Sequence, residues 1–210
     1  EQGETRAERI SASETIVSMH EHAFYFPKDA ADVEAYCRQG RSFTAYDALS
    51  ESNLDAVFDW HLDGVLRAHS KNGWKFSEVV HDLGMRAVDI AKQDFVIRAS
   101  SVDDIHRAHE EGKVAIVPSI EGCMMIENEI DRLDVLYGLG VRALGITYSE
   151  SNALGTGLND EDSDGGLTKF GEKAVGRMNK LGILIDPSHA SRQTTLDTCE
   201  VSDDPVVLSH

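Results

Sequence analysis

The sequence is poor in cysteine and lacks long apolar runs. Its three cysteines, Cys37, Cys123 and Cys199, are far apart and form no Cys-x-x-Cys pair, which excludes a disulfide framework and a zinc ribbon. No apolar run approaches the roughly 18 residues of a membrane span, and no charged-then-apolar leader opens the chain. We therefore expect no membrane segment and a reducing compartment, the cytoplasm. The first residue is Glu1 and not Met, so the removal of a leader stays open.

Basic residues are also scarce. Only 20 Lys and Arg stand against 37 Asp and Glu, which gives a formal net charge of -17. Nucleic-acid binding needs clustered Lys and Arg, so the composition argues against it. The acidic excess is spread over both halves of the chain and indicates a solvated surface. Hydrophobic residues make up 41% of the 210 residues, enough for one globular domain over residues 1–210.

From residue 75 onward, amphipathic helices alternate with short apolar strands. Three helices are predicted to end near Gly112, Gly140 and Gly182, because glycine commonly follows the last turn of a helix. Strands that are apolar on every residue are typical of a parallel sheet covered by helices. Residues 1–15 are expected to form a frayed lead-in or a helix, and residues 28–52 a loop. The predicted strands whose bounds can be given are 15–19, 114–118, 143–147, 183–186 and 206–208.

This α/β alternation fits both an open doubly wound sheet and a closed (β/α)8 TIM barrel. Five polar residues each follow the end of a different strand: His20, Glu121, Tyr148, His189 and His210. A barrel brings all its strand ends to one mouth, so these residues favour the barrel. Barrels run to about 250 residues and this chain offers about seven strands. We therefore expect a barrel that is truncated before its last strand or strands.

The same residues predict a metal centre. His20 and His22 lie two apart at a strand end, where alternation sends both side chains to one side. Histidine and carboxylate side chains are ligands that Zn²⁺ prefers. Together with Glu121, His189 and His210 they are too many for one tetrahedral ion with an open position, but they suit two Zn²⁺ ions bridged by Glu121. A hydroxide held between the two ions would make the site hydrolytic.

Several segments resemble the membrane (renal) dipeptidase family, peptidase family M19. The resemblance lies in residues 119–122, 131–142, 166–171, 181–191 and 205–210. It implies a (β/α)8 barrel with a binuclear zinc site that hydrolyses dipeptides, often with a D-residue at the C-terminal position. It also implies that His20 and His22 hold one ion, that His189 and His210 hold the other, and that Glu121 bridges them. Family members often pair, which makes a homodimer possible.

The chain departs from the family pattern in three ways. His22 stands where the family usually has Asp, as in the wider amidohydrolase superfamily. Tyr148 stands where the family usually has a substrate-contacting histidine, and its phenol can donate a hydrogen bond to a carbonyl oxygen or oxyanion. The family's downstream arginine and aspartate have no counterpart before His210. Two alternatives to a dipeptidase therefore stay open: a related hydrolase of another amide, lactone or ester, and a non-catalytic truncated barrel.

The remaining histidines and Cys123 have simpler interpretations. Cys123 follows Glu121 closely and is interpreted as a small buried thiol and not as a metal ligand. Five histidines in charged, helix-like stretches are expected on the surface: His61, His69, His81, His106 and His109.

Two groups of polar residues near the predicted strand ends are also explained without a ligand. The acidic run 160–165 lacks the closing glutamate of a calcium loop, so it predicts a solvated loop. Asp186 and Ser188 flank His189, and two interpretations stay open for them. They orient the imidazole of His189, or they form hydrogen bonds that end the strand.

Overall fold

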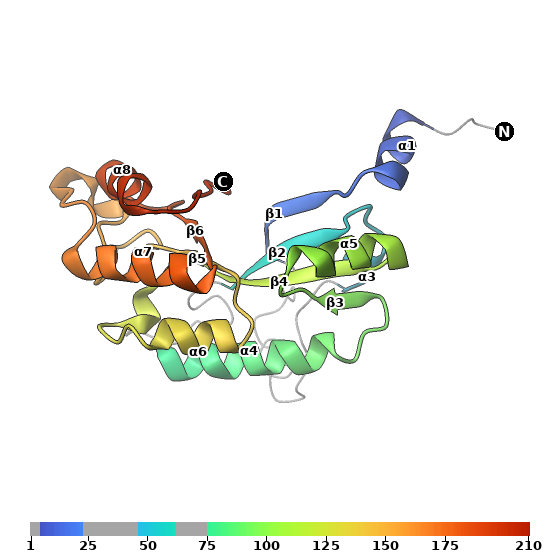
Figure 1. The fold of residues 1–210 in the computed structure, drawn as a ribbon, viewed down its shortest axis with the longest axis horizontal. Coiled ribbons are helices and arrows are strands. Elements are labelled where there is room, and N and C mark those ends of the chain that lie inside the picture. The colour runs from blue at the N-terminus through green and yellow to red at the C-terminus, as the bar shows by residue number, and fades with distance from the viewer. Residues whose placement is uncertain (1–4, 23–45, 62–74) are drawn as a thin grey trace, which may run out of the picture. The chain divides into compact units, whose positions relative to one another are not determined.

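The computed structural model describes residues 5–22, 46–61 and 75–210, in which helices and strands alternate (Figure 1). It divides into two compact units, Glu1–Asp59 with Met85–Val117, and Trp60–Gly84 with Pro118–His210. We call them the first and the second unit. The paired strands for which a register is defined are all parallel. The prediction of parallel α/β units is therefore confirmed.

In its described residues, the first unit contains four strands or parts of strands. The strand β1 (Val17–Glu21) pairs with β2 (Ala56–His61), and its register shifts between Ser18 and Glu21. The strand β3 (Val96–Arg98) pairs with the beginning of β4 (Val114–Ile120). The helices of this unit are α1 (Arg6–Ser13), α3 (Tyr46–Ser50), the end of α4 (Phe76–Ile90) and α5 (Val102–Glu111).

Local sequence explains the bounds of α5. Ser101 and Asp104 form a capping box, in which each side chain accepts a hydrogen bond from the other residue's backbone N–H. Gly112 ends the helix at φ 63°, a left-handed conformation in which glycine avoids the steric cost of a Cβ. Apolar residues of this unit form two small buried clusters between its strands and helices, one around Val57 and Ile116 and one around Ala56 and Ala115.

The second unit holds the C-terminal half of the chain. The end of β4 pairs with β5 (Ala143–Gly145), and β5 pairs with β6 (Leu184–Asp186). Thr168 caps the N-terminus of α7 through the N–H of Gly171, and Gly182 ends this helix at φ 73°. Besides the start of α4, the described residues of this unit form two short 3-10 helices and three α-helices: η1 (Met124–Ile126), η2 (Leu158–Ser163), α6 (Arg132–Gly138), α7 (Lys169–Leu181) and α8 (Arg192–Val201).

One large apolar core supports the second unit. It includes Ile120 of β4, Leu144 of β5, Ile185 of β6 and Met178 of α7, all nearly or fully buried. These strands are covered by apolar helix faces, so the ends of the strands are held rigidly. The residues that follow the strand ends therefore have defined positions.

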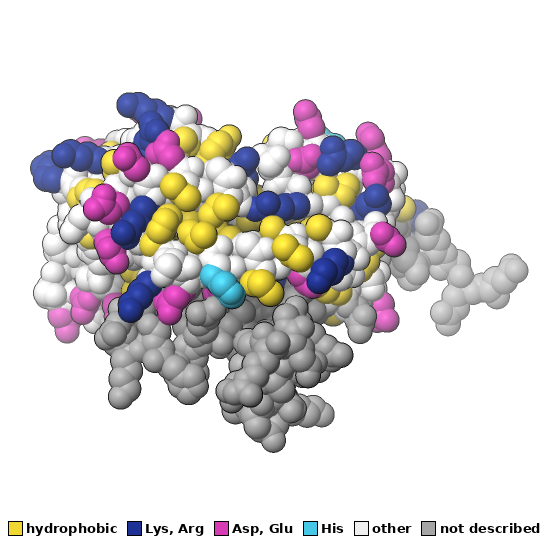
Figure 2. Space-filling view, turned by 90° about the horizontal axis from the view of Figure 1, so that it is seen from below, with side chains coloured by type: hydrophobic (Ala, Val, Ile, Leu, Met, Phe, Trp, Pro, Cys, Tyr) yellow, Lys and Arg dark blue, Asp and Glu magenta, His cyan; other side chains and the backbone are white. Residues whose placement is uncertain are grey.

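The helix α4 is amphipathic, as its spacing of apolar residues predicts. Its early turns bury Val79 and Leu83 in the core of the second unit, and its last residue, Ile90, is buried in the first. Met85 and Val88 of the same helix are exposed. Figure 2 views the molecule from below, the side on which α4 lies in Figure 1, and hydrophobic side chains are visible there among acidic and basic ones.

Three expectations about local structure are corrected. Tyr46–Ser50 is a short helix and not part of a loop. The strand β2 was not predicted, because it carries the polar residues Asp59 and His61. Both are buried, and Asp59 is paired with Arg86 at 3.1 Å. Residues 206–208 are not a strand, although the N–H of Val207 donates to the carbonyl of Ile185 at 3.0 Å.

No helix in the described parts of the chain combines the length and the apolar character that a membrane crossing demands. Glu1, Cys37 and His69 lie outside the described residues, as does the predicted loop up to residue 45.

Candidate metal centre

Glu121 is the first residue after β4 and is positioned by backbone contacts. Its N–H donates to the carbonyl of His61 at 3.0 Å, and its side chain is only 4% exposed. The next residue, Gly122, has φ 94°, and a Cβ added there would lie 2.9 Å from the backbone nitrogen of Tyr148. Only glycine permits this close approach between the ends of β4 and β5. The sequence Glu121-Gly122 therefore places a buried carboxylate next to the residues that follow β5.

His189 follows β6 in an unusual backbone conformation. Its φ is 67°, in the left-handed region that few residues other than glycine adopt. The N–H of Leu158 donates to the His189 carbonyl at 2.9 Å, which ties the loop after β5 to this turn. Strained residues of this kind cluster at functional sites, where the surrounding structure holds them. The fold therefore fixes the direction of the His189 imidazole.

Two neighbours from the loop after β5 contact the His189 ring. Tyr148 stacks on it, with ring centroids 4.5 Å apart and an interplanar angle of 29°. The hydroxyl oxygen of Ser149 lies 3.4 Å from Nδ1 of His189. The Nε2 atom is on the other side of the ring and faces Glu121. Tyr148 was predicted to donate a hydrogen bond to substrate, and this role stays a prediction.

Glu121, His189 and His210 meet in the second unit. Nε2 of His189 lies 2.9 Å from Oε1 of Glu121, and Nε2 of His210 lies 3.4 Å from the same oxygen. The two Nε2 atoms are 2.8 Å apart. One ligand atom from each residue thus falls within 4.8 Å of the others, as a group that holds one cation requires.

The electrostatics of this cluster favour a cation. Burial, and after it the negative charge of Asp186, raises the pKa of Glu121 from 4.5 to about 7. A buried carboxylate of this kind is costly to ionise unless a positive charge compensates it. The donor set of two imidazoles and one carboxylate therefore fits a divalent ion such as Zn²⁺.

His20 and His22 belong to the first unit. Their rings meet edge to face with centroids 5.0 Å apart, and their Nε2 atoms lie 3.4 Å apart. The register shift of β1 falls between Ser18 and Glu21, next to this pair, and such irregularities often redirect side chains near functional sites. The prediction that both side chains lie on the same side is confirmed. Their membership of one centre with Glu121 stays a prediction.

Two of the simpler interpretations are decided by burial. His61 was expected on the surface, and this is wrong because it is buried at the end of β2, where its carbonyl accepts from Glu121. His81 and His106 are exposed as expected. Cys123 is a fully buried thiol, as predicted, and burial raises its pKa to about 12.

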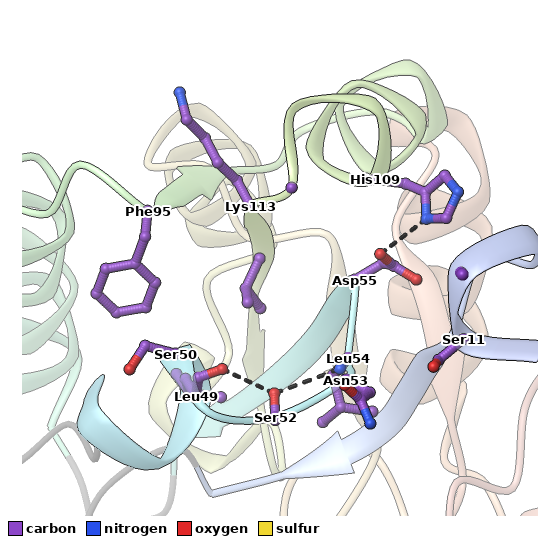
Figure 3. A pocket seen from close by; sticks show the side chains of 13 residues that line it. Ser11, Leu49, Ser50, Ser52, Asn53, Leu54, Asp55, Phe95, His109 and Lys113 are labelled. Atoms are coloured by element: carbon purple, nitrogen blue, oxygen red, sulfur yellow. Dashed lines mark hydrogen bonds and ion pairs between the residues drawn. The ribbon is translucent and has the colours of Figure 1, made fainter. Parts of the chain in front are cut away.

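His109 is half-buried at a pocket in the first unit. Its Nδ1 lies 2.8 Å from Oδ1 of Asp55, and both side chains line a cavity of about 330 Å³ (Figure 3). The cavity is next to residues that precede β2 and β4, including Asp55 and Lys113. In a barrel, this N-terminal end of the strands contributes to stability, whereas active sites lie at the C-terminal ends. The cavity contains none of the predicted site residues.

The acidic segment after β5 is a structured loop. Asp160 accepts from the hydroxyl and the N–H of Ser151, at 2.5 and 2.9 Å, and Asp164 accepts from the hydroxyl of Ser191 at 2.6 Å. These hydrogen bonds lower the pKa of both carboxylates, although for Asp164 desolvation by burial, which raises it, is the largest single effect. Asp186 accepts from the N–H of Ser188 at 2.9 Å, which is the strand-end hydrogen bonding considered for this pair.

Two serines of the site, Ser149 and Ser209, were not predicted from the sequence. Both hydroxyl oxygens face an Nδ1 atom of a predicted metal ligand, His189 and His210 respectively. The only available signal was their position beside residues already selected, since serine is common at strand ends and in turns.

Comparison with known proteins identifies the family of the chain. The sequence model of the family described as membrane dipeptidase (peptidase family M19) matches residues 5–210. A curated relative, the dipeptidase aclJ of Aspergillus oryzae, is 34% identical over 120 residues, which cover 56% of this chain and 28% of the relative.

Two solved structures share the fold. An amidohydrolase from Pseudomonas aeruginosa aligns with a TM-score of 0.72 and 24% identity, over 96% of this chain and 54% of that chain. A metallopeptidase from Rhodobacter sphaeroides, solved with a phosphinate mimic of the dipeptide L-Ala-D-Ala, aligns with a TM-score of 0.57 and 20% identity, over 100% and 56%. The chain thus spans about half of each solved chain. The predicted barrel fold, present here in part, is confirmed.

Proposed function

Because the chain belongs to the membrane dipeptidase family, peptidase family M19, we propose that it contributes the metal centre of a zinc-dependent dipeptidase. The observation that carries the proposal is the convergence of Glu121, His189 and His210 on one point in the second unit. The reaction is hydrolysis of the amide bond of a dipeptide, and the sequence resemblance supports it together with this donor set.

The proposed centre has two ions and five ligands. His189 and His210 hold one ion, His20 and His22 hold the other, and Glu121 bridges them. Imidazole nitrogens and a carboxylate are the ligands of catalytic zinc sites. When bound, the zinc pair would lower the pKa of a water molecule toward neutrality and polarise the amide carbonyl.

Three residues of the chain would set the charge and the geometry of this centre: Glu121, His189 and Tyr148. Glu121 supplies a negative charge where few waters reach, since it is 4% exposed. The turn at His189 and the stacked ring of Tyr148 hold one imidazole in a fixed direction. We propose that the Tyr148 hydroxyl donates a hydrogen bond to the substrate oxygen as negative charge develops there, which is how such donors stabilise a transition state.

The test measures zinc content and dipeptide hydrolysis in the same preparations of the full chain. L-Ala-D-Ala and L-Ala-L-Ala are suitable substrates, because a mimic of the first was bound by the Rhodobacter sphaeroides metallopeptidase. We expect two zinc ions per chain and turnover, and loss of both in Glu121→Gln. The matched control is Glu129→Gln, an exposed carboxylate at the turn before α6. A zinc-supplied protein that binds no metal and cleaves neither substrate would refute the proposal.

A second candidate substrate class is another amide, a lactone or an ester. It is favoured by His22, which replaces the usual aspartate and removes one negative charge from the proposed site. Assaying a lactone and ester panel beside the dipeptides separates the two. Turnover of the panel without dipeptide cleavage would favour the second class.

A further inference from the structure

A chain of hydrogen-bonding groups leads from Asp186 to the ring of His210. The hydroxyl of Ser209 donates to Oδ2 of Asp186, and the same hydroxyl oxygen lies 3.0 Å from Nδ1 of His210. We call the three residues the Asp186–Ser209–His210 relay. All three belong to the second unit.

The relay is held in place by backbone contacts. Asp186 is 1% exposed, and its Oδ1 accepts from the N–H of Ser188 at 2.9 Å and of Ser209 at 3.4 Å. The Ser188 hydroxyl donates to the carbonyl of His210 and accepts from its N–H, at 3.3 and 3.4 Å. The ring of His210 is thus attached at its backbone and at Nδ1, which leaves its direction little freedom.

Hydrogen-bond chemistry assigns the donors and acceptors along the relay, starting from the carboxylate of Asp186. A carboxylate only accepts, and a serine hydroxyl has one hydrogen to give. Ser209 gives that hydrogen to Asp186, so its oxygen accepts from Nδ1–H of His210. A neutral imidazole carries one ring hydrogen, so Nε2 keeps its lone pair.

We infer that Asp186 and Ser209 are positioning residues that fix His210 as the Nδ1–H tautomer and so present the Nε2 lone pair to a metal ion. This Nε2 atom is the one that lies 3.4 Å from Glu121 Oε1 and 2.8 Å from His189 Nε2. The inference rests on the proposed function only for its metal, because the tautomer itself is a property of the metal-free chain. Groups that orient metal-bound histidines in this way commonly change metal affinity 10–100-fold.

Three variants test the relay. In Asp186→Asn, the amide oxygen still accepts from Ser188 while the amide nitrogen faces Ser209 and donates to it. The Ser209 hydrogen then points to Nδ1 of His210 and moves the ring proton to Nε2. Ser209→Ala removes the link, and Ser209→Thr keeps the hydroxyl. The matched control is Asp134→Asn, which removes an acceptor of Arg177 on the surface of α6.

Two readouts are needed in the full chain. Long-range ¹⁵N–¹H NMR of the metal-free protein identifies the protonated nitrogen of His210, with His210→Gln to assign its signals. Chelator competition gives the zinc dissociation constant, and circular dichroism confirms folding of each variant. We expect Nδ1–H in the wild type, Ser209→Thr and Asp134→Asn, and Nε2–H in Asp186→Asn. Zinc affinity falls 10–100-fold in Ser209→Ala and Asp186→Asn, and returns in Ser209→Thr.

The possible failures are distinguishable. Nε2–H in the metal-free wild type, or wild-type zinc affinity in folded Ser209→Ala, would overturn the relay while leaving the proposed function intact. A wild type that shows Nδ1–H but binds no zinc would refute the proposed function and keep the tautomer assignment.

Discussion

Two contacts between a histidine and a carboxylate have nearly the same length but different surroundings. In the first unit, His109 lies 2.8 Å from Asp55, and in the second, His189 lies 2.9 Å from Glu121. Asp55 precedes β2, whereas Glu121 follows β4. The end of the strand at which the carboxylate lies therefore indicates function better than the length of its contact with the histidine does.

The two carboxylates also differ in what else they contact. Asp55 accepts from the N–H of Ile16 at 2.7 Å through its second oxygen, which joins β1 to the loop before β2. Glu121 instead has a second imidazole, His210, beside the oxygen that contacts His189. In the first arrangement, the carboxylate of Asp55 contacts a backbone N–H and one imidazole. In the second, a carboxylate and two imidazoles surround one point, and a cation bound there would stabilise the arrangement.

The largest expected effect comes from neutralising the two carboxylates in turn. Glu121→Gln removes the proposed bridging charge, so dipeptide turnover should fall roughly a thousand-fold, or about 4 kcal/mol of transition-state stabilisation. Asp55→Asn should leave turnover and zinc content near the wild-type values. The comparison fails if both variants lose activity to the same extent while remaining folded.

The pH dependence of the free energy of unfolding should reveal the burial of Glu121 in the second unit. The pKa of Glu121 in the folded protein is raised to about 7. Its neutral carboxyl group therefore contributes fully to the free energy of unfolding at a pH below its pKa in the unfolded chain, and this contribution is lost as the pH rises through 7. For the metal-free protein this amounts to roughly 3 kcal/mol. Glu121→Gln, which mimics the neutral form, should become more stable than the wild type above pH 7.

Urea unfolding at pH 5 and pH 8 measures this difference. Saturating zinc should abolish it in the wild type, because the bound ion stabilises the charged carboxylate. An unchanged difference in unfolding free energy between variant and wild type across this range would show that burial of Glu121 carries no such cost.

The variant Tyr148→Phe distinguishes the role of the tyrosine ring from that of its hydroxyl group in the second unit. Tyr148→Phe keeps the ring that stacks on His189, so zinc affinity should be unchanged. Loss of the proposed hydrogen bond to the reacting oxygen should lower kcat roughly a hundred-fold with little change in KM. A weakened zinc affinity with unchanged kcat would instead assign Tyr148 to the orientation of His189.

The smallest effect is expected from changing Asp55 in the first unit. Asp55→Ala removes the acceptor of Ile16 N–H and of His109, so the free energy of unfolding should fall by about 1–3 kcal/mol. Denaturant unfolding measures this loss, with the exposed His106→Ala as the control on the same helix as His109. Unchanged stability would mean that Asp55 does not hold β1 in place.

Sequence patterns predicted the regular parts of the second unit well. The apolar spacing of α7, its end at Gly182 and the buried strand β6 follow from local physics. The patterns failed at β2, where Asp59 and His61 are buried with partners supplied by distant residues. They also failed at residues 206–208, which are apolar like a strand but form no strand, although the N–H of Val207 donates to the carbonyl of Ile185 in β6.

The site was predictable to the level of residue types but not of orientation. Glu121, His189 and His210 could be selected because each follows a predicted strand, and the structure brings these three together. The left-handed backbone of His189 and the hydroxyl of Ser209 on His210 could not be derived, because both depend on contacts between separate loops.

The most direct test of the account is the position of zinc itself. Crystals of the zinc-saturated full chain, measured on both sides of the zinc absorption edge, give an anomalous difference map that locates the ions. The account predicts a peak about 2.0–2.2 Å from a carboxylate oxygen of Glu121 and from Nε2 of both His189 and His210. A map with no peak at these three residues, or with its peaks only beside Asp55 and His109, would contradict it.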